Sequence, residues 1–165
     1  MTGTNKRTSN KSKRLLLPLL LAVSCLGACT RGTLLDKTYD LPRNGWVYTE
    51  AVSFDTQVSD TSTGYDWVLS IKHNDTYHWS NAYFLITTIF PDMETHIDTL
   101  ECILATKDGK WIGSRFGKFH NIGFLYKQDI RFPQTGEYRF EIRQAMREDT
   151  LQGIVATGMK ISPHQ

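Results

Sequence analysis

From Trp46 to the C-terminus, apolar and polar residues alternate with a period of two, which is typical of β-strands that bury one face. The clearest alternation lies in "GEYRFEIRQAM" (136–146), where Tyr138, Phe140 and Ile142 are separated by charged residues. The segments 65–72, 97–105 and 153–161 show the same period. The run "YFLITTIF" (83–90) is apolar on both parities, which predicts a central strand covered on both faces.

Turn signals separate these segments. Asp108-Gly109 favours a hairpin turn, because both residue types tolerate positive φ. No segment predicts a long helix, although 143–152 has the composition for one or two helical turns. Seven or eight short strands separated by turns predict an all-β fold, an antiparallel β-sandwich with Greek-key or jelly-roll connections. We assign residues 45–165 to this single domain.

The first 28 residues have a different pattern. Five basic residues and no acid occupy positions 1–14, and positions 15–28 carry no charge. A basic lead followed by a short apolar core predicts a secretory signal peptide over 1–28. The apolar run is shorter than the roughly 20 residues that a permanent membrane-spanning helix needs.

The end of this leader holds two cysteines. Leu26-Gly27-Ala28-Cys29 resembles the bacterial lipobox, in which the signal is cut before a cysteine that carries a diacylglyceryl group. The competing site before Cys25 lacks the leucine and ranks second. A metal pair is disfavoured, because no second cysteine or histidine pair lies nearby. The sequence therefore predicts a lipid anchor at Cys29 and a polar tether over 29–44, which reaches at most roughly 50 Å when extended.

Removal of the leader changes the charge. Without its five basic residues, 14 of the 19 lysines and arginines face 17 acids, a net charge of −3. This balance excludes the basic footprint of a nucleic-acid-binding protein. Cys102 then remains as the one free thiol. It alternates in phase with Leu100 and Leu104, on the face of its strand that points to the core, so we expect it to be buried and inert.

The titratable residues do not form a recognisable catalytic or metal-binding pattern. The five histidines are scattered, and His73 and His78 are five residues apart across a predicted turn, so they do not share a strand face. Asp92, Glu94 and Asp98 follow a proline in a loop, where acids are usually solvated. No nucleophile elbow and no phosphate loop is present. The sequence predicts no catalytic site, no metal and no cofactor.

The segment 110–131, "KWIGSRFGKFHNIGFLYKQDIR", is the best candidate for a functional surface. It holds five basic residues and one acid, interleaved with aromatic residues and broken by glycines. Aromatic residues and arginine dominate protein interfaces, and they also suit glycan stacking or an anionic headgroup layer. The alternative is that the aromatics cap the end of the sandwich and the cations are solvated. The candidate contacts are Trp111, Arg115, Phe116 and Lys118.

Several segments together resemble the GldH family of gliding-motility lipoproteins from Bacteroidetes. The resemblance covers the leader cysteine and most of 46–162, with its most specific parts in "FPD" (90–92), "DTLECILA" (98–105), "GKWIG" (109–113) and "GEYRFEIRQAMREDTLQGI" (136–154). Two positions depart from the family pattern. Met93 stands where a turn glycine is usual, and Thr106 stands where the family tends to have aspartate.

The resemblance implies a non-enzymatic lipoprotein of the gliding machinery, which is linked to type IX secretion. We expect it to bind envelope protein partners through 110–131 and an adjoining corner, 144–151, where Gln144 and Arg147 would supply polar contacts. No acidic cluster and no aspartate retention signal follows Cys29, so we expect the periplasmic leaflet of the outer membrane. "DTL" at 98–100 and 149–151 resembles the O-glycosylation sequence of this phylum, with Thr99 and Thr150 as acceptors.

A carbohydrate-binding module on an envelope lipoprotein is the alternative function. β-Sandwiches with exposed aromatic residues bind glycans by stacking. The chain offers four tryptophans for this purpose, at Trp46, Trp67, Trp79 and Trp111.

Overall fold

The computed structural model describes residues 1–3 and 32–165. Residues 4–28 of the predicted signal peptide, Cys29 and the first residues of the predicted tether lie outside the described residues. Gly32–Gln165 forms one structural unit. Within the described part of the chain, no helix is long and apolar enough to cross a membrane.

Eleven strands make up this unit, and no helix occurs in the described residues. Three of the strands span only two or three residues, so eight longer strands form the body. The strands are β1 (Leu35–Asp40), β2 (Trp46–Val47), β3 (Val52–Val58), β4 (Tyr65–Asn74), β5 (Asn81–Ile89), β6 (Thr95–Ile103), β7 (Ser114–Phe116), β8 (Phe119–Ile130), β9 (Gly136–Gln144), β10 (Thr150–Leu151) and β11 (Ile154–Pro163).

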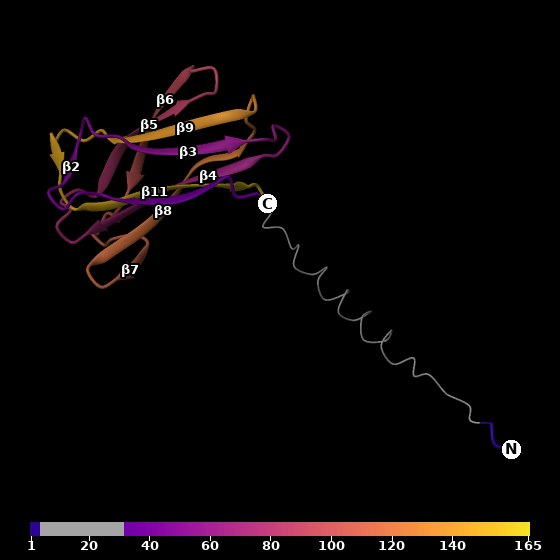
Figure 1. Ribbon diagram of the computed structural model, residues 1–165. Coiled ribbons are helices and arrows are strands. Elements are labelled where there is room, and N and C mark those ends of the chain that lie inside the picture. Colours follow the sequence, from indigo (N-terminus) through magenta and orange to yellow (C-terminus); the bar gives the residue numbers. More distant parts are fainter. Residues whose placement is uncertain (4–31) are drawn as a thin grey trace. The chain divides into compact units, whose positions relative to one another are not determined.

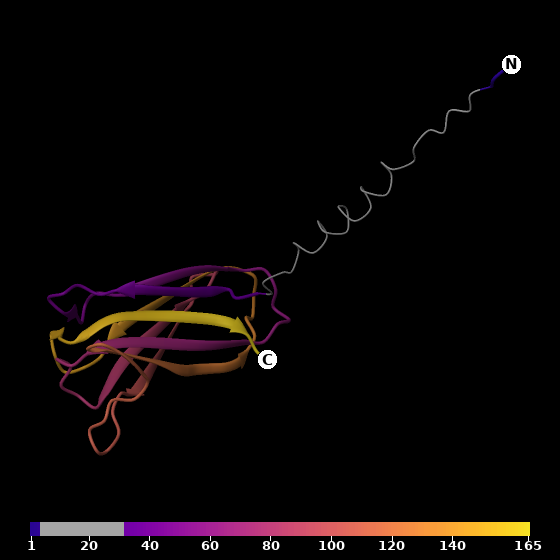
Figure 2. The ribbon, with the colours of Figure 1, turned by 90° about the horizontal axis from the view of Figure 1, so that it is seen from below.

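The strands form two antiparallel sheets. One has the order β1-β11-β4-β8-β7, the other has the order β3-β9-β5-β6, and β10 pairs with β2 as a short ribbon. Figure 1 shows β6, β5, β9 and β3 as the upper layer, and Figure 2 shows the lower sheet from below, with β11 in yellow. The predicted antiparallel β-sandwich is confirmed.

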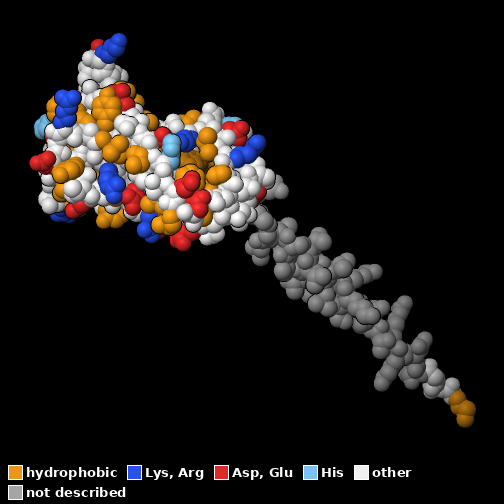
Figure 3. Space-filling model, turned by 90° about the horizontal axis from the view of Figure 1, so that it is seen from above, with side chains coloured by type: hydrophobic (Ala, Val, Ile, Leu, Met, Phe, Trp, Pro, Cys, Tyr) orange, Lys and Arg blue, Asp and Glu red, His pale blue; other side chains and the backbone are white. Residues whose placement is uncertain are grey.

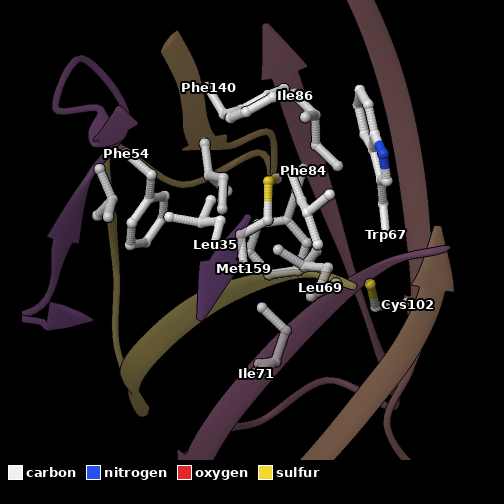
Figure 4. Close-up of a cluster of buried hydrophobic side chains, with 14 of the residues drawn as sticks. Leu35, Phe54, Trp67, Leu69, Ile71, Phe84, Ile86, Cys102, Phe140 and Met159 are labelled. Carbon is white, nitrogen blue, oxygen red and sulfur yellow. The ribbon is translucent and has the colours of Figure 1, made fainter. Parts of the chain in front are cut away.

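The core lies between the inward faces of the two sheets. On β4, burial alternates along the whole strand, with Trp67 and Leu69 at most 4% exposed. The indole of Trp67 stacks on Phe132 at 5.4 Å between ring centroids and meets Phe140 of β9 edge to face at 5.1 Å. Figure 4 shows Trp67, Leu69 and Phe140 among the side chains that fill the space between the layers, together with Met159 of β11. On β4 and β9 the period of two in the sequence therefore identifies the buried face correctly, whereas β11 is buried on both faces over Ala156–Met159.

The predicted tether over 29–44 is wrong for its second half, because Leu35–Asp40 is the edge strand β1, paired with β11. Only Leu35 of this strand is buried, so its sequence shows no alternation. β1 is held by backbone hydrogen bonds and by close approach to β11. A Cβ at Gly158 would lie 2.7 Å from the carbonyl oxygen of Lys37, so only glycine fits there.

Two other expectations of local structure are also corrected. The outward face of β5 is not fully covered, because Tyr83 is 37% exposed and Leu85 is half-buried. The segment 143–152 forms the end of β9, a loop and β10, without a helical turn. The Asp108-Gly109 turn is present, with φ of 74° at Gly109, and it closes a hairpin in which Ala105 bridges Trp111.

The strand register defines two ends of the sandwich. At one end, Leu35 pairs with Ile161 and Tyr65 pairs with Ile130. At the other end lie β2, β7 and the C-terminal end of β9. Figure 1 shows the C-terminus on the right, and β2 and β7 on the left. The ten residues of β4 span about 30 Å between these ends.

Candidate partner-binding surface

The β7–β8 hairpin presents three of the predicted contact residues at its tip. Phe116 pairs with Phe119 across a two-residue turn in which Gly117 has φ of 60°, the conformation that a tight hairpin turn requires of its first residue. Phe116 is 86% exposed, and Arg115 and Lys118 are exposed beside it. The Nε of Arg115 donates to the carbonyl oxygen of Gly117 at 2.8 Å, which orders the guanidinium. The tip therefore offers one apolar ring between two cations.

Trp111, the fourth predicted contact of this segment, lies elsewhere. Its half-buried indole meets the ring of His73 edge to face at 4.4 Å and lies 5.8 Å from the ring of His120. It also packs near Tyr77, at 6.4 Å between centroids. Trp111 thus covers the end of the core, as the capping alternative expected, and its position separates it from the exposed tip.

A hollow of about 550 Å³ opens at the same end of the sandwich, on the side of β5 and β9. Trp79 and Tyr83 contribute exposed aromatic rings to it, 47% and 37% exposed. The indole N–H of Trp79 donates to Glu148 at 2.8 Å, and exposed Arg147 lies beside that contact. Figure 3 views the molecule from this sheet's side and shows hydrophobic patches between charged side chains.

Gln144, expected to be a polar contact, is only 2% exposed. Its Nε2 donates to the carbonyl oxygen of Glu148 at 2.7 Å, and its Oε1 accepts from the backbone N–H of Met146 at 2.8 Å. Both ends of the amide are therefore used to shape the loop that displays Arg147. The buried Gln144 side chain therefore holds the loop that lines the hollow, and it is not available as a surface contact.

Sequence reasoning did not assign Tyr83 to this surface, and it included Glu148 in the corner 144–151 without its partner Trp79. Tyr83 was hidden in an apolar run that looked buried on both faces, and Glu148 lies 69 residues from its partner Trp79. Of the two predicted glycosylation positions, Thr99 is exposed on β6, and Thr150 is half-buried in β10. Glycosylation of either residue stays a prediction.

A polar network joins the two sheets between β6 and β8. Asp98 accepts hydrogen bonds from Lys127 at 2.8 Å and from the hydroxyl of Tyr126, and His96 lies 3.0 Å from it. Burial alone would raise the pKa of Asp98. The hydrogen bonds from Lys127 and Tyr126, together with the positive charge of Lys127, outweigh burial and lower its pKa to about 2. Asp98 is therefore a structural carboxylate that stays ionised.

Two other titratable groups of the interior are fully buried. Burial raises the pKa of the Cys102 thiol to about 12, so this fully buried cysteine stays protonated. Burial lowers the pKa of His73, which stacks on His120 at 5.1 Å and stays neutral. Among the residues that the structure describes, no three His, Cys, Asp or Glu side chains come together as a metal-binding group.

Comparisons with known proteins agree with the resemblance in the sequence. Residues 33–161 match the model of the family described as "GldH lipoprotein". The chain is 30% identical over 150 residues to the gliding motility lipoprotein GldH of Flavobacterium johnsoniae, covering 87% of this chain and 92% of that protein. It is also 30% identical over 123 residues to a gliding motility lipoprotein GldH homolog of Christiangramia forsetii, covering 70% of this chain and 76% of the homolog.

We expect the Asp98 network to make stability depend on acid pH. The pKa of Asp98 falls from 3.8 to about 2 on folding. Its contribution is therefore fully present above about pH 4 and is lost as the pH falls towards 2. The change Asp98→Asn should reduce the free energy of unfolding by about 2 kcal/mol at pH 7. Urea unfolding of both proteins should show this difference shrinking between pH 4 and pH 2, and a difference that stays constant would contradict the role of the carboxylate.

Proposed function

Because the chain belongs to the GldH lipoprotein family, we propose that it is a non-enzymatic component of the gliding machinery linked to type IX secretion. In this proposal the protein is held at an envelope membrane by lipid and acts through contacts with other proteins. The relative from Flavobacterium johnsoniae is named for gliding motility, which supports the assignment to this machinery.

The exposed tip of the β7–β8 hairpin is the observation that carries the protein-contact role. Phe116 is the most exposed large hydrophobic side chain between Gly32 and Gln165, at 86%. It projects from an ordered hairpin instead of a loose loop, and Arg115 and Lys118 flank it. Aromatic residues and arginine supply most of the binding energy in protein interfaces. A ring held in water at this position is explained most simply by a partner that covers it.

The tip lies far from Leu35, where the chain enters the sandwich, and this distance supports the same role. Leu35 lies at one end of the sandwich, and Phe116 and the hollow beside Arg147 lie at the other, about 30 Å away along β4. The six residue steps from Cys29 to Leu35 can span at most about 22 Å between Cys29 and β1. With β1 bound into the sheet, a lipid at Cys29 would hold the Leu35 end near the headgroups. Both candidate contact surfaces would then face away from the membrane.

The proposed anchor is a diacylglyceryl group on Cys29, and the proposed place is the periplasmic leaflet of the outer membrane. The sequence after Cys29 supports this leaflet, because it has neither an acidic cluster nor an aspartate at position 30. A single acyl chain binds membranes only marginally, whereas two or more chains on one residue give stable anchoring.

Gene deletion and complementation in the native bacterium test the role. Deletion should abolish colony spreading and reduce type IX cargo at the cell surface, and the wild-type gene should restore both. The double change Arg115→Ala, Phe116→Ala should fail to restore them and should weaken partner binding about tenfold or more, because it removes the apolar anchor and one cation. Thermal unfolding should be unchanged, since neither side chain is buried.

Tyr39→Ala is the matched control, because Tyr39 is an aromatic residue that is 51% exposed on β1 and is not one of the candidate contact residues. It should complement fully. Normal spreading and normal cargo delivery in the deletion strain would contradict the proposed role in the machinery. Full complementation by the double variant would instead contradict the role of the hairpin tip.

Glycan binding at the hollow is a second candidate function, and the exposed pair Trp79 and Tyr83 favours it. Of the four tryptophans, Trp79 alone has an exposed ring for stacking. Trp46 and Trp67 are buried in the core, and Trp111 is half-buried. We expect any glycan that binds the purified protein on an array to lose binding in Trp79→Ala. Silence across the array, or binding that survives this change, would remove the candidate.

A further inference from the structure

β6 has one free edge, and the hydrogen-bond pattern shows which residues line it. Within the described residues, Thr95–Ile103 pairs only with β5. Next to the two ends of this ladder, Phe90 N–H donates to Glu94 and Leu104 N–H donates to Ser80. Hydrogen-bonded pairs alternate along an antiparallel ladder, so these two bonds set the phase for the residues between them. Even-numbered residues of β6 bond to β5, and the odd-numbered residues direct N–H and C=O outwards.

This edge lacks most of the features by which proteins protect exposed strands. Such features are short strands, lysine, proline, inward-pointing charges and β-bulges. β6 has nine residues, no proline and no lysine, and its register with β5 continues without a shift. Its one inward-pointing acid, Asp98, is paired with Lys127 and leaves the outward N–H and C=O groups free. A continuous edge of this length is a template for another strand.

The other edges of the two sheets are protected. β7 has only three residues. The free part of β8 is bulged opposite Trp67 and has a positive φ of 49° at Asp129. β1 and β3 lie against each other, because the hydroxyl of Thr56 donates to the carbonyl oxygen of Leu34 at 2.6 Å. β6 is therefore the long edge of the described domain whose backbone has no paired strand, although the Asp98 side chain links it to Tyr126 and Lys127 of β8.

The side chains on the outward face of β6 indicate the chemistry of an incoming strand. Ile97 and Ile103 are 60% and 48% exposed, which is unusual for isoleucine on a strand. Exposed Glu101 lies between them, and its carboxylate accepts from Asn81 at 2.6 Å. An added strand would bury the two isoleucines with branched apolar side chains, and a lysine or arginine would pair with Glu101.

We propose that β6 binds an extended segment of a partner protein by strand addition, with apolar residues at alternate positions and a cation facing Glu101. A second copy of this chain fits less well. Pairing β6 with itself would place Asp98 and Glu101 of both copies in one strand pair, and neither strand carries a lysine or arginine. The proposal is independent of the lipid anchor and of the β7–β8 hairpin.

Peptide binding to the purified full-length chain tests the proposal. The probe is a fluorescein-labelled nine-residue peptide of alternating valine and threonine with one central lysine. The control peptide has the same side chains, with the edge-facing backbone nitrogens methylated. Fluorescence anisotropy measures both. We expect the probe to bind and the methylated peptide not to bind, because strand addition depends on backbone N–H groups.

Ile97→Pro removes one outward N–H and leaves the bonds to β5 in place, so it should weaken binding about tenfold or more. Ile97→Lys introduces a guarding side chain at the same position and should also weaken binding, which keeps the test valid if the proline variant does not fold. Tyr39→Lys, the same introduced charge on the exposed edge strand β1, should bind as wild type.

Three results would overturn the proposal. The first is no binding of the probe up to roughly 1 mM. The second is equal affinity for the two peptides or equal affinity of wild type and both Ile97 variants. The third is dimerisation of the chain that Ile97→Pro abolishes, because this would assign the edge to a second copy.

Discussion

The packing of aromatic and aliphatic side chains between the two sheets is the interaction on which the rest of the structure depends. Trp67, Phe132 and Phe140 pack ring against ring within it, and burying one such ring contributes about 2–3 kcal/mol. The described domain has one free cysteine and no disulfide, so this core must hold the sheets together by itself. The loops and edges can then carry polar and exposed residues without loss of the fold.

The burial of the titratable groups in the core explains why we expect function at the surface of the sandwich. Cys102 is buried and stays protonated, His73 is fully buried, and Asp98 is engaged with Lys127 and Tyr126. In contrast, the hairpin tip at Phe116 and the hollow beside Arg147 are exposed on ordered strands or on a loop fixed from below. A rigid body with contact surfaces at one end suits a component of an assembly. The free edge of β6 adds a surface of a different kind, which recognises backbone.

The sequence predicted the buried faces of the long strands well, because alternation reports burial directly. It missed β1, since backbone pairing with β11 leaves no pattern in side chains. It also could not separate Trp111 from Phe116, because both are aromatic residues in one basic segment and only the hairpin fold puts one inside and the other outside. At Met93 the sequence departs from the family pattern, but the turn still forms. The φ of 69° at Met93 explains why glycine suits this turn, and the Met93 N–H nevertheless donates to Phe90 at 2.9 Å.

The central claim is that a lipid on Cys29 holds this sandwich at an envelope membrane, with its contact surfaces turned outwards. Fractionation of native cells that express Cys29→Ser measures the anchor directly. The account predicts that the variant leaves the outer-membrane fraction and migrates as an unprocessed precursor, while wild type is processed and sediments with the outer membrane. A serine variant that remains processed and membrane-bound would contradict the anchor and the orientation drawn from it.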